Sequence, residues 1–272
     1  MFRKVMLFFL ALAFCGVVVA GIDLTRHWRA AERVDSSGAD LSHWHYRFSG
    51  AAAPAGYCEG ALQSWPVRWH RMITFPQRAV VEFPPPGVEQ MVVDRLLLRD
   101  LALLGVEDIG LYECRGLTPA VMSELSGNSS VRMLSVTYCD VTNEGANLLW
   151  SGCPKLEAVQ FYGNDIGDEA FRNVKAARAL KLVDLANAAL TNQTIVYLRE
   201  APHLEQLILA DASVGEDCGP LLAAMPRLRR VDLRGVTGAV AIGKRLRALR
   251  PDITVFTNPR EIRDWRSEIG GN

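Results

Sequence analysis

The stretch LVDLANAALT (residues 182–191) decides the fold, because its apolar residues suit neither a simple amphipathic helix nor a strand with one buried face. Three further stretches share its pattern: LEAVQFYGNDI (156–166), LEQLILADASV (204–214) and LRRVDLRGV (228–236). When the register is set at Leu180, each stretch has apolar residues at offsets 0, 3 and 5. The chain therefore contains an internal repeat.

The repeat has a nearly constant length along the chain. Its first residues, offset 0, are Val106, Val131, Leu156, Leu180, Leu204 and Leu228, which are spaced by 25, 25, 24, 24 and 24 residues. Offsets 3 and 5 are apolar throughout: Ile109 and Leu111, Leu134 and Val136, Val159 and Phe161, Val183 and Leu185, Leu207 and Leu209, Val231 and Leu233. Residues two apart share one face of a strand, so these offsets predict a short strand with one buried face.

The second half of each repeat predicts a helix. Offsets 15 and 18 lie on one helical face and are apolar in three repeats: Ala146 and Leu149, Phe171 and Val174, Ile195 and Leu198. Thr142, Thr191 and Thr237 stand where an N-cap oxygen is needed. Pro154, Pro202 and Pro226 then end the helices, because proline cannot continue the hydrogen-bond ladder. Stacked strand–turn–helix units predict an α/β solenoid with a continuous core.

Two stretches give the chain a family resemblance. LEAVQFYGNDI (156–166) and LKLVDLANAAL (180–190) match the pattern L-x-x-L-x-L-x-x-[N/C]-x-L, so residues 106 to about 256 resemble the leucine-rich repeat family. VRMLSVTYCDVTNEGANLLWSGCPKLEAV (131–159) is similar to its cysteine-containing subclass. The resemblance implies parallel strands on a concave face and helices on a convex face.

The same resemblance assigns a role to offset 8. It implies that Cys114, Cys139 and Asn164 point inward and satisfy backbone groups of the turns, while Ala188, Ala212 and Val236 depart from that pattern. A disulfide between Cys114 and Cys139 is the alternative, because the two residues would be stacked neighbours.

Residues 5–22, VMLFFLALAFCGVVVAGI, contain no charge and have about the minimum length for a membrane-spanning helix. We expect a single-pass anchor with the short N-terminus inside and the repeat domain outside the cytoplasm. A cleaved signal peptide is the alternative, since Val18 and Ala20 fit a small-residue cleavage site. The protein would then be secreted or periplasmic.

These features divide the 272 residues into four parts: an anchor or signal (1–22), a juxtamembrane helix, linker and N-terminal cap (23–78), the repeat domain (79–256) and a C-terminal capping helix (257–272). RAVVEF (78–83) predicts an edge strand, and VEQMVVDRLLLRDLALLG (88–105) predicts a helix leading into the first repeat. Residues 23–35 are expected to be helical. In the last part, Asn258 suits an N-cap, and Ile262, Trp265 and Ile269 form an apolar stripe.

No constellation of catalytic residues can be recognised. The sequence has no G-x-S-x-G, phosphate-binding loop, H-E-x-x-H or C-x-x-C pattern, and His43, His45, His70 and Cys58 lack the spacing of a metal site. The formal net charge is zero, and no basic patch interleaved with aromatic residues indicates nucleic-acid binding. We therefore expect no enzyme, cofactor, metal, nucleic acid or small-molecule substrate.

What remains is the surface of the predicted sheet. Offsets 4, 6 and 7 are expected to point away from the core or onto its rim, and they bring tyrosine side chains close to carboxylates. The candidate partner-binding residues are Tyr112, Tyr138, Tyr162, Asp184, Asn187 and Asp211. The sequence thus predicts a membrane-anchored, noncatalytic module that binds an unidentified protein through its concave face. The alternative is an assembly or structural factor of a membrane complex, with the N-terminal region as its binding part.

Overall fold

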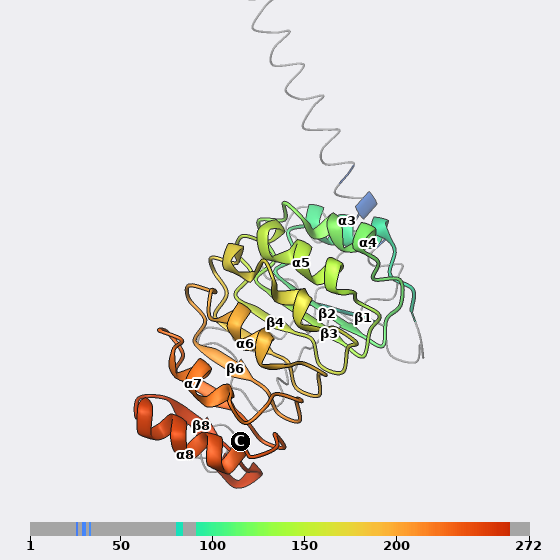
Figure 1. The fold of residues 1–272 in the computed structure, drawn as a ribbon. Coiled ribbons are helices and arrows are strands. Elements are labelled where there is room, and N and C mark those ends of the chain that lie inside the picture. The colour runs from blue at the N-terminus through green and yellow to red at the C-terminus, as the bar shows by residue number, and fades with distance from the viewer. Residues whose placement is uncertain (1–25, 27–28, 31–32, 34–79, 84–90, 262–272) are drawn as a thin grey trace, which may run out of the picture.

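The computed structural model describes residues 26, 29–30, 33, 80–83 and 91–261, which form a solenoid-like α/β fold (Figure 1). Within these residues one parallel sheet has eight strands in the order β1-β2-β3-β4-β5-β6-β7-β8. The strands are β1 (Val80–Phe83), β2 (Asp108–Tyr112), β3 (Met133–Thr137), β4 (Ala158–Gln160), β5 (Leu182–Asp184), β6 (Gln206–Ile208), β7 (Arg230–Asp232) and β8 (Thr254–Phe256). Each strand therefore pairs with the next one along the chain, as a solenoid requires.

Helices form the second layer, along one side of the sheet (Figure 1). The α-helices are α3 (Arg95–Leu103), α4 (Pro119–Met122), α5 (Asn143–Gly152), α6 (Asn192–Leu198), α7 (Cys218–Ala223) and α8 (Ala239–Leu249). The 3-10 helices are η1 (Ser123–Leu125), η2 (Asp168–Phe171) and η3 (Val174–Ala176). In the repeat that begins at Leu156, η2 and η3 take the place of the expected α-helix.

The predicted periodic burial is confirmed by the strand register. Ile109 pairs with Leu134, Leu134 with Val159, and the series continues through equivalent residues to Val231 and Val255. All offset-3 and offset-5 side chains are at most 1% exposed and belong to one core cluster. The buried helix residues Leu149, Phe171 and Leu198 lie in the same cluster, so strands and helices share a continuous core.

The expected helix caps are confirmed at two of three positions. The hydroxyl of Thr142 accepts a hydrogen bond from Gly145 N at 3.1 Å, and that of Thr191 accepts one from Gln193 N at 3.1 Å. The prediction for Thr237 is wrong: α8 begins after Gly238, which has a φ of 73° and provides no side-chain cap. A glycine adopts this left-handed backbone without steric cost, so here the chain enters the helix through its backbone conformation alone.

The first strand and helix of the sheet region correspond to those predicted from the sequence. The expected edge strand is β1, which pairs with β2 in parallel. The expected helix is α3, but it begins later than the apolar pattern suggests. Val93 N donates to Arg115 O and Arg115 N donates to Met91 O, so residues 91–93 pair as extended chain before the carboxylate of Asp94 caps the helix.

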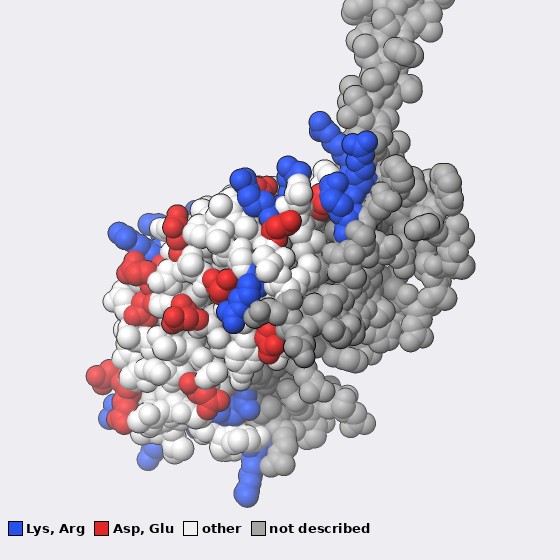
Figure 2. Space-filling view, turned by 90° about the vertical axis from the view of Figure 1, so that its right-hand side faces the viewer, with Lys and Arg blue, Asp and Glu red and all other residues white. Residues whose placement is uncertain are grey.

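Residues 26, 29, 30 and 33 are helical, in agreement with the helix expected over 23–35. Ala30 is 0% exposed, and the guanidinium of Arg33 binds both carboxylate oxygens of Asp100 in α3, at 2.5 and 2.7 Å. These contacts attach the described N-terminal residues to α3. Basic side chains gather at this end of the described surface (Figure 2).

No helix in the described part of the chain is both long and apolar enough to cross a bilayer. The candidate anchor, residues 5–22, lies outside the described residues, and so do the expected linker and cap over 34–78. The apolar stripe of Ile262, Trp265 and Ile269 also lies outside them. The start of that last helix is described, and Asn258 is its N-cap as predicted, because its side-chain oxygen accepts from Arg260 N and Glu261 N.

Candidate functional site

The chain leaves each strand through the same backbone conformation at offset 7. Every residue at this offset has a positive φ: Glu113 (50°), Tyr138 (52°), Gly163 (66°), Asn187 (57°), Asp211 (58°) and Gly235 (73°). Glycine, asparagine and aspartate tolerate this left-handed region best. The turn itself therefore explains why Asn187 and Asp211 occupy this position, whereas Tyr138 and Glu113 adopt it at a steric cost of about 1–2 kcal/mol each.

Three of the predicted site residues, Tyr112, Tyr138 and Tyr162, form one continuous row, here called the tyrosine row. The ring centroids of Tyr112 and Tyr138 are 6.0 Å apart and those of Tyr138 and Tyr162 are 5.2 Å apart, with interplanar angles of 87° and 89°. Tyr112 ends β2, and the other two rings follow β3 and β4 at the same edge of the sheet. The row therefore arises from the parallel register, which aligns residues 24 to 26 apart in the chain.

The tyrosine row is open to solvent at one end. Tyr112 is 48% exposed and Tyr138 is 39% exposed, while Tyr162 is half-buried and packs against apolar residues of the strands. Gly163 makes room for the row, because a Cβ at this position would overlap the ring of Tyr138. A strained tyrosine lying over a glycine thus presents its ring on the surface.

Two hydroxyl groups of the row, those of Tyr112 and Tyr162, have raised pKa values. A hydrogen bond with Tyr138 and partial burial raise the pKa of Tyr162 to about 12. The negative charges of Asp211 and Asp184 act in the same direction. A hydrogen bond with Glu113 likewise raises the pKa of Tyr112. The row therefore combines aromatic surface with hydroxyl groups and neighbouring carboxylates.

The expectation that Asp184 is presented to a partner is wrong, because its side chain is 0% exposed. It belongs to a buried polar ladder: Ser135 Oγ donates to Gln160 Oε1 at 2.7 Å, and Gln160 Nε2 donates to Asp184 Oδ2 at 3.1 Å. Asp184 Oδ1 also accepts from Ala186 N at 3.0 Å. Offset 4 does point away from the helices, as predicted, but a buried carboxylate in this position stabilises the turn rather than forming an accessible contact.

The strand face turned away from the helices also carries buried apolar residues. A second apolar cluster, separate from the main core, contains Met133, Ala158, Leu182, Ala186, Ile208 and Ala210. This cluster was not predicted from the sequence, because offsets 4, 6 and 7 were expected to point away from the core or onto its rim and offset 2 was not assigned. The sequence did contain a signal for it: several strands have apolar residues at offsets 2, 4 or 6 as well as at offsets 3 and 5. A strand that is apolar on both faces is typically buried on both.

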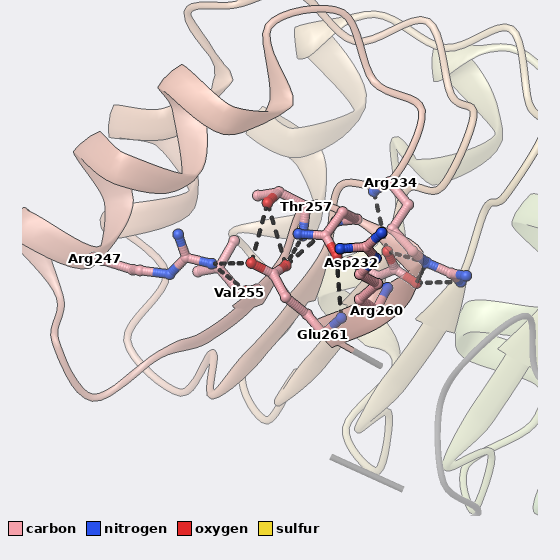
Figure 3. Close-up of polar contacts among 8 residues, drawn as sticks. Asp232, Arg234, Arg247, Val255, Thr257, Arg260 and Glu261 are labelled. Atoms are coloured by element: carbon pink, nitrogen blue, oxygen red, sulfur yellow. Dashed lines mark hydrogen bonds and ion pairs between the residues drawn. The ribbon is translucent and has the colours of Figure 1, made fainter. Parts of the chain in front are cut away.

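Asp211 and Asn187 remain exposed on the continuation of the row. Beyond Asp211 lies Arg234, whose guanidinium donates to both oxygens of Asp232 at 2.7 to 3.0 Å (Figure 3). This hydrogen bonding raises the pKa of Arg234, and the charges of Asp211 and Asp184 add to it. Arg234 was not among the predicted partner-binding residues; it lies in the turn two residues after Asp232, the last residue of β7.

The predicted inward role of Cys139 and Asn164 is confirmed. Asn164 Nδ2 donates to Val136 O at 2.6 Å and its Oδ1 accepts from Cys139 N at 3.0 Å, while Cys139 Sγ contacts Thr137 O at 3.3 Å. The four described cysteines, Cys114, Cys139, Cys153 and Cys218, are free and buried, so the alternative disulfide between Cys114 and Cys139 is not formed. These side chains satisfy turns and pack the core.

No group of His, Cys, Asp and Glu in the described residues has the arrangement of a metal site. His43, His45, His70 and Cys58, which the sequence analysis considered as a metal set, lie outside these residues. The predicted partner-binding residues that are exposed or half-buried are those of the tyrosine row, Asn187 and Asp211. The sequence matches no protein-family model, and a search of curated proteins finds no similar sequence.

Proposed function

We propose that this chain is a leucine-rich repeat protein that binds a protein partner along the tyrosine row while attached to a membrane through residues 5–22. The 24- to 25-residue period, the unbroken parallel register and the inward residues Cys139 and Asn164 support the family assignment. The edge-to-face row of exposed tyrosines carries the proposal of binding.

The physical basis is that tyrosine combines a large apolar ring with a hydrogen-bonding tip and orders few torsions on binding. Such residues are enriched in the buried centres of protein interfaces, where they contribute most of the affinity. Here the rings are already oriented by one another, and Gly163 leaves space for them. Their ordering therefore costs little free energy when a partner binds.

The carboxylates beside the row suggest the chemistry of the partner. Glu113 and Asp211 are exposed, and both lie at offset 7 of their repeats. A cationic side chain could contact a tyrosine face and a carboxylate together. We therefore propose that the bound segment carries Arg or Lys together with apolar residues, and that it crosses the repeats along the row. This activity needs no catalytic group.

The experiment uses the full chain in its native membranes, with a photoreactive residue at position 112 and the same residue at position 249 as a control. Tyr112 and Leu249 are both exposed, but Leu249 lies on α8, far from the row in the chain. We expect a discrete protein adduct at position 112 that is absent at position 249. Equal adducts at both positions, or none at position 112, would overturn the proposed site.

A pair of tyrosine variants then tests the role of the rings. Tyr138→Asn should lower partner affinity roughly 30-fold, the loss expected for an interface hot spot. Tyr197→Ala is the matched control, because Tyr197 lies on α6 in the helix layer and its hydroxyl contacts Glu169. Unchanged capture by Tyr138→Asn, with capture lost on changing Trp44, Trp65 and Trp69, would favour the assembly factor that binds through its N-terminal region.

A further inference from the structure

The outer face of α3 exposes apolar side chains next to arginines. Val92, Leu96 and Leu103 are 69%, 46% and 38% exposed, and Arg95 and Arg99 stand between them in the sequence. Positions 96, 99 and 103 are separated by three and four residues, so they lie along one side of α3, and Val92 precedes the helix in the extended segment. The opposite side, with Leu97, Leu98 and Leu101, is buried in the core.

Exposed apolar residues that occur singly need no explanation, but several on one helical side form a patch. Together, Val92, Leu96, Leu103, Arg95 and Arg99 are called here the arginine–leucine face.

Further arginines adjoin this face from the N-terminal residues. Arg26 and Arg29 are exposed, and Arg33 binds Asp100 on the side of α3. The acidic groups nearby are mostly engaged, since Asp100 binds Arg33 and Glu124 binds Arg95. Within the described residues, no acidic side chain forms an ion pair with Arg26, Arg29 or Arg99. This end of the solenoid is therefore basic (Figure 2), and Val92, Leu96 and Leu103 make it partly apolar.

We infer that the arginine–leucine face lies against a membrane surface containing anionic lipids. Leucine side chains can enter the boundary between headgroups and acyl chains while neighbouring arginines contact phosphate groups, which is how interfacial amphipathic helices bind. Each arginine brought to such a surface strengthens binding on the order of fivefold at physiological salt. Arg26, Arg29 and Arg99 together would thus contribute on the order of a hundredfold.

The arginine–leucine face is also connected to the candidate membrane anchor through Arg33 and a short stretch of chain, which favours a membrane as its binding partner. Arg26 follows Ile22, the end of the uncharged segment, by four residues, and a chain spans at most about 3.6 Å per residue. Arg26 therefore lies within about 14 Å of the end of the candidate anchor, whatever the intervening conformation. Arg33 binds α3 through Asp100, so α3 is joined to the chain at a residue only eleven positions after Ile22. The inference rests on the membrane attachment that forms part of the proposed function.

The test uses the full chain reconstituted into vesicles of phosphatidylcholine with phosphatidylserine, and into vesicles of phosphatidylcholine alone. A photoreactive diazirine residue replaces Leu96, or Leu249 on α8 as the control, and lipid adducts are counted by mass spectrometry. We expect at least tenfold more lipid adduct at position 96 than at position 249 on the anionic vesicles, and a clear decrease on the neutral ones. Equal labelling of the two positions, or equal labelling on both kinds of vesicle, would overturn the inference.

Charge variants and a flotation assay complete the design. Reversing Arg26, Arg29 and Arg99 to Glu should remove most of the adduct at position 96, whereas reversing Arg227, Lys244 and Arg245, which are exposed near the other end, should not. Flotation of the chain with the vesicles reports membrane attachment separately. If the chain floats but position 96 is not labelled, this inference fails and the attachment stands; if the chain does not float, both fail.

Discussion

The left-handed backbone at Tyr138 leads to a prediction about how two substitutions at this position change the free energy of unfolding. Its φ of 52° is sterically unfavourable for tyrosine, at a cost of about 1–2 kcal/mol. Asparagine visits this region far more readily than most side chains, so Tyr138→Asn should recover about 1 kcal/mol of that cost. Alanine has a Cβ and no side-chain hydrogen bond to offer, so Tyr138→Ala should recover nothing.

Both substitutions remove the same ring contacts. Tyr138 makes two edge-to-face contacts, with Tyr112 and Tyr162, each worth about 0.5–1.5 kcal/mol when buried and less for a ring that is 39% exposed. The loss is then about 1–2 kcal/mol for either variant. We expect Tyr138→Ala to be destabilised by this amount and Tyr138→Asn by only about 0–1 kcal/mol.

The assay is urea unfolding of the full chain, monitored by circular dichroism. The midpoints of the two variants report stability provided that their measured m-values agree. Thr137 provides the control, because it is the last residue of β3 and does not have a positive φ. Thr137→Asn should have no advantage over Thr137→Ala. Equal midpoints for Tyr138→Asn and Tyr138→Ala, or the same asparagine advantage at position 137, would refute the reasoning from backbone strain.

Three further predictions concern the core and its ionisable groups. Trp150→Phe should destabilise the fold by about 2–3 kcal/mol in urea unfolding, because the buried indole donates to Ala170 O at 2.7 Å and its loss leaves that carbonyl unpaired; a loss under 1 kcal/mol would contradict this. Burial alone would raise the pKa of Glu157, but hydrogen bonds from Lys181 and Arg132 hold it below its usual 4.5. Its contribution to stability is thus present above pH 4.5 and is lost as the pH falls below it, so Glu157→Gln should flatten the decline in unfolding free energy there. An unchanged slope would count against a stabilising role of the ion pairs that Glu157 forms with Arg132 and Lys181. Burial raises the pKa of the Cys153 thiol from 9.0 to about 12, so stability should decrease as the pH rises from 9 to 12, and Cys153→Ala should reduce that slope in alkaline unfolding curves; identical slopes would show that the thiol does not titrate differently on unfolding.

Much of the tyrosine row could be predicted from the sequence, because it depends on a regular period. Tyr112 and Tyr162 share offset 6 and Tyr138 follows at offset 7, so any parallel stack of these repeats brings them to one edge. The burial of Asp184 could not be predicted in the same way. Its hydrogen bond comes from Gln160 in the preceding repeat, and the alternation of polar and apolar residues gives no measure of how enclosed the second strand face is.

The start of α3 illustrates a second limit. The apolar pattern from Val88 onward is compatible with a helix, yet residues 91–93 pair with Arg115, which is more than 20 residues away in the chain. Local preference favoured the helix, and a tertiary hydrogen bond selected the extended form. The helix then begins at Arg95, after its N-cap Asp94.

The amino-acid sequence by itself determined the repeat length, the alternation of strand and helix, and the identity of the core positions. These properties follow from side-chain hydrophobicity combined with two local periods, two residues in a strand and 3.6 in a helix. Only the tertiary structure decided that Asp184 is buried, that Tyr112, Tyr138 and Tyr162 meet edge to face, and that Arg33 pairs with Asp100. Each of these depends on groups far apart in the chain, whose distances and exposure are set by how the repeats stack.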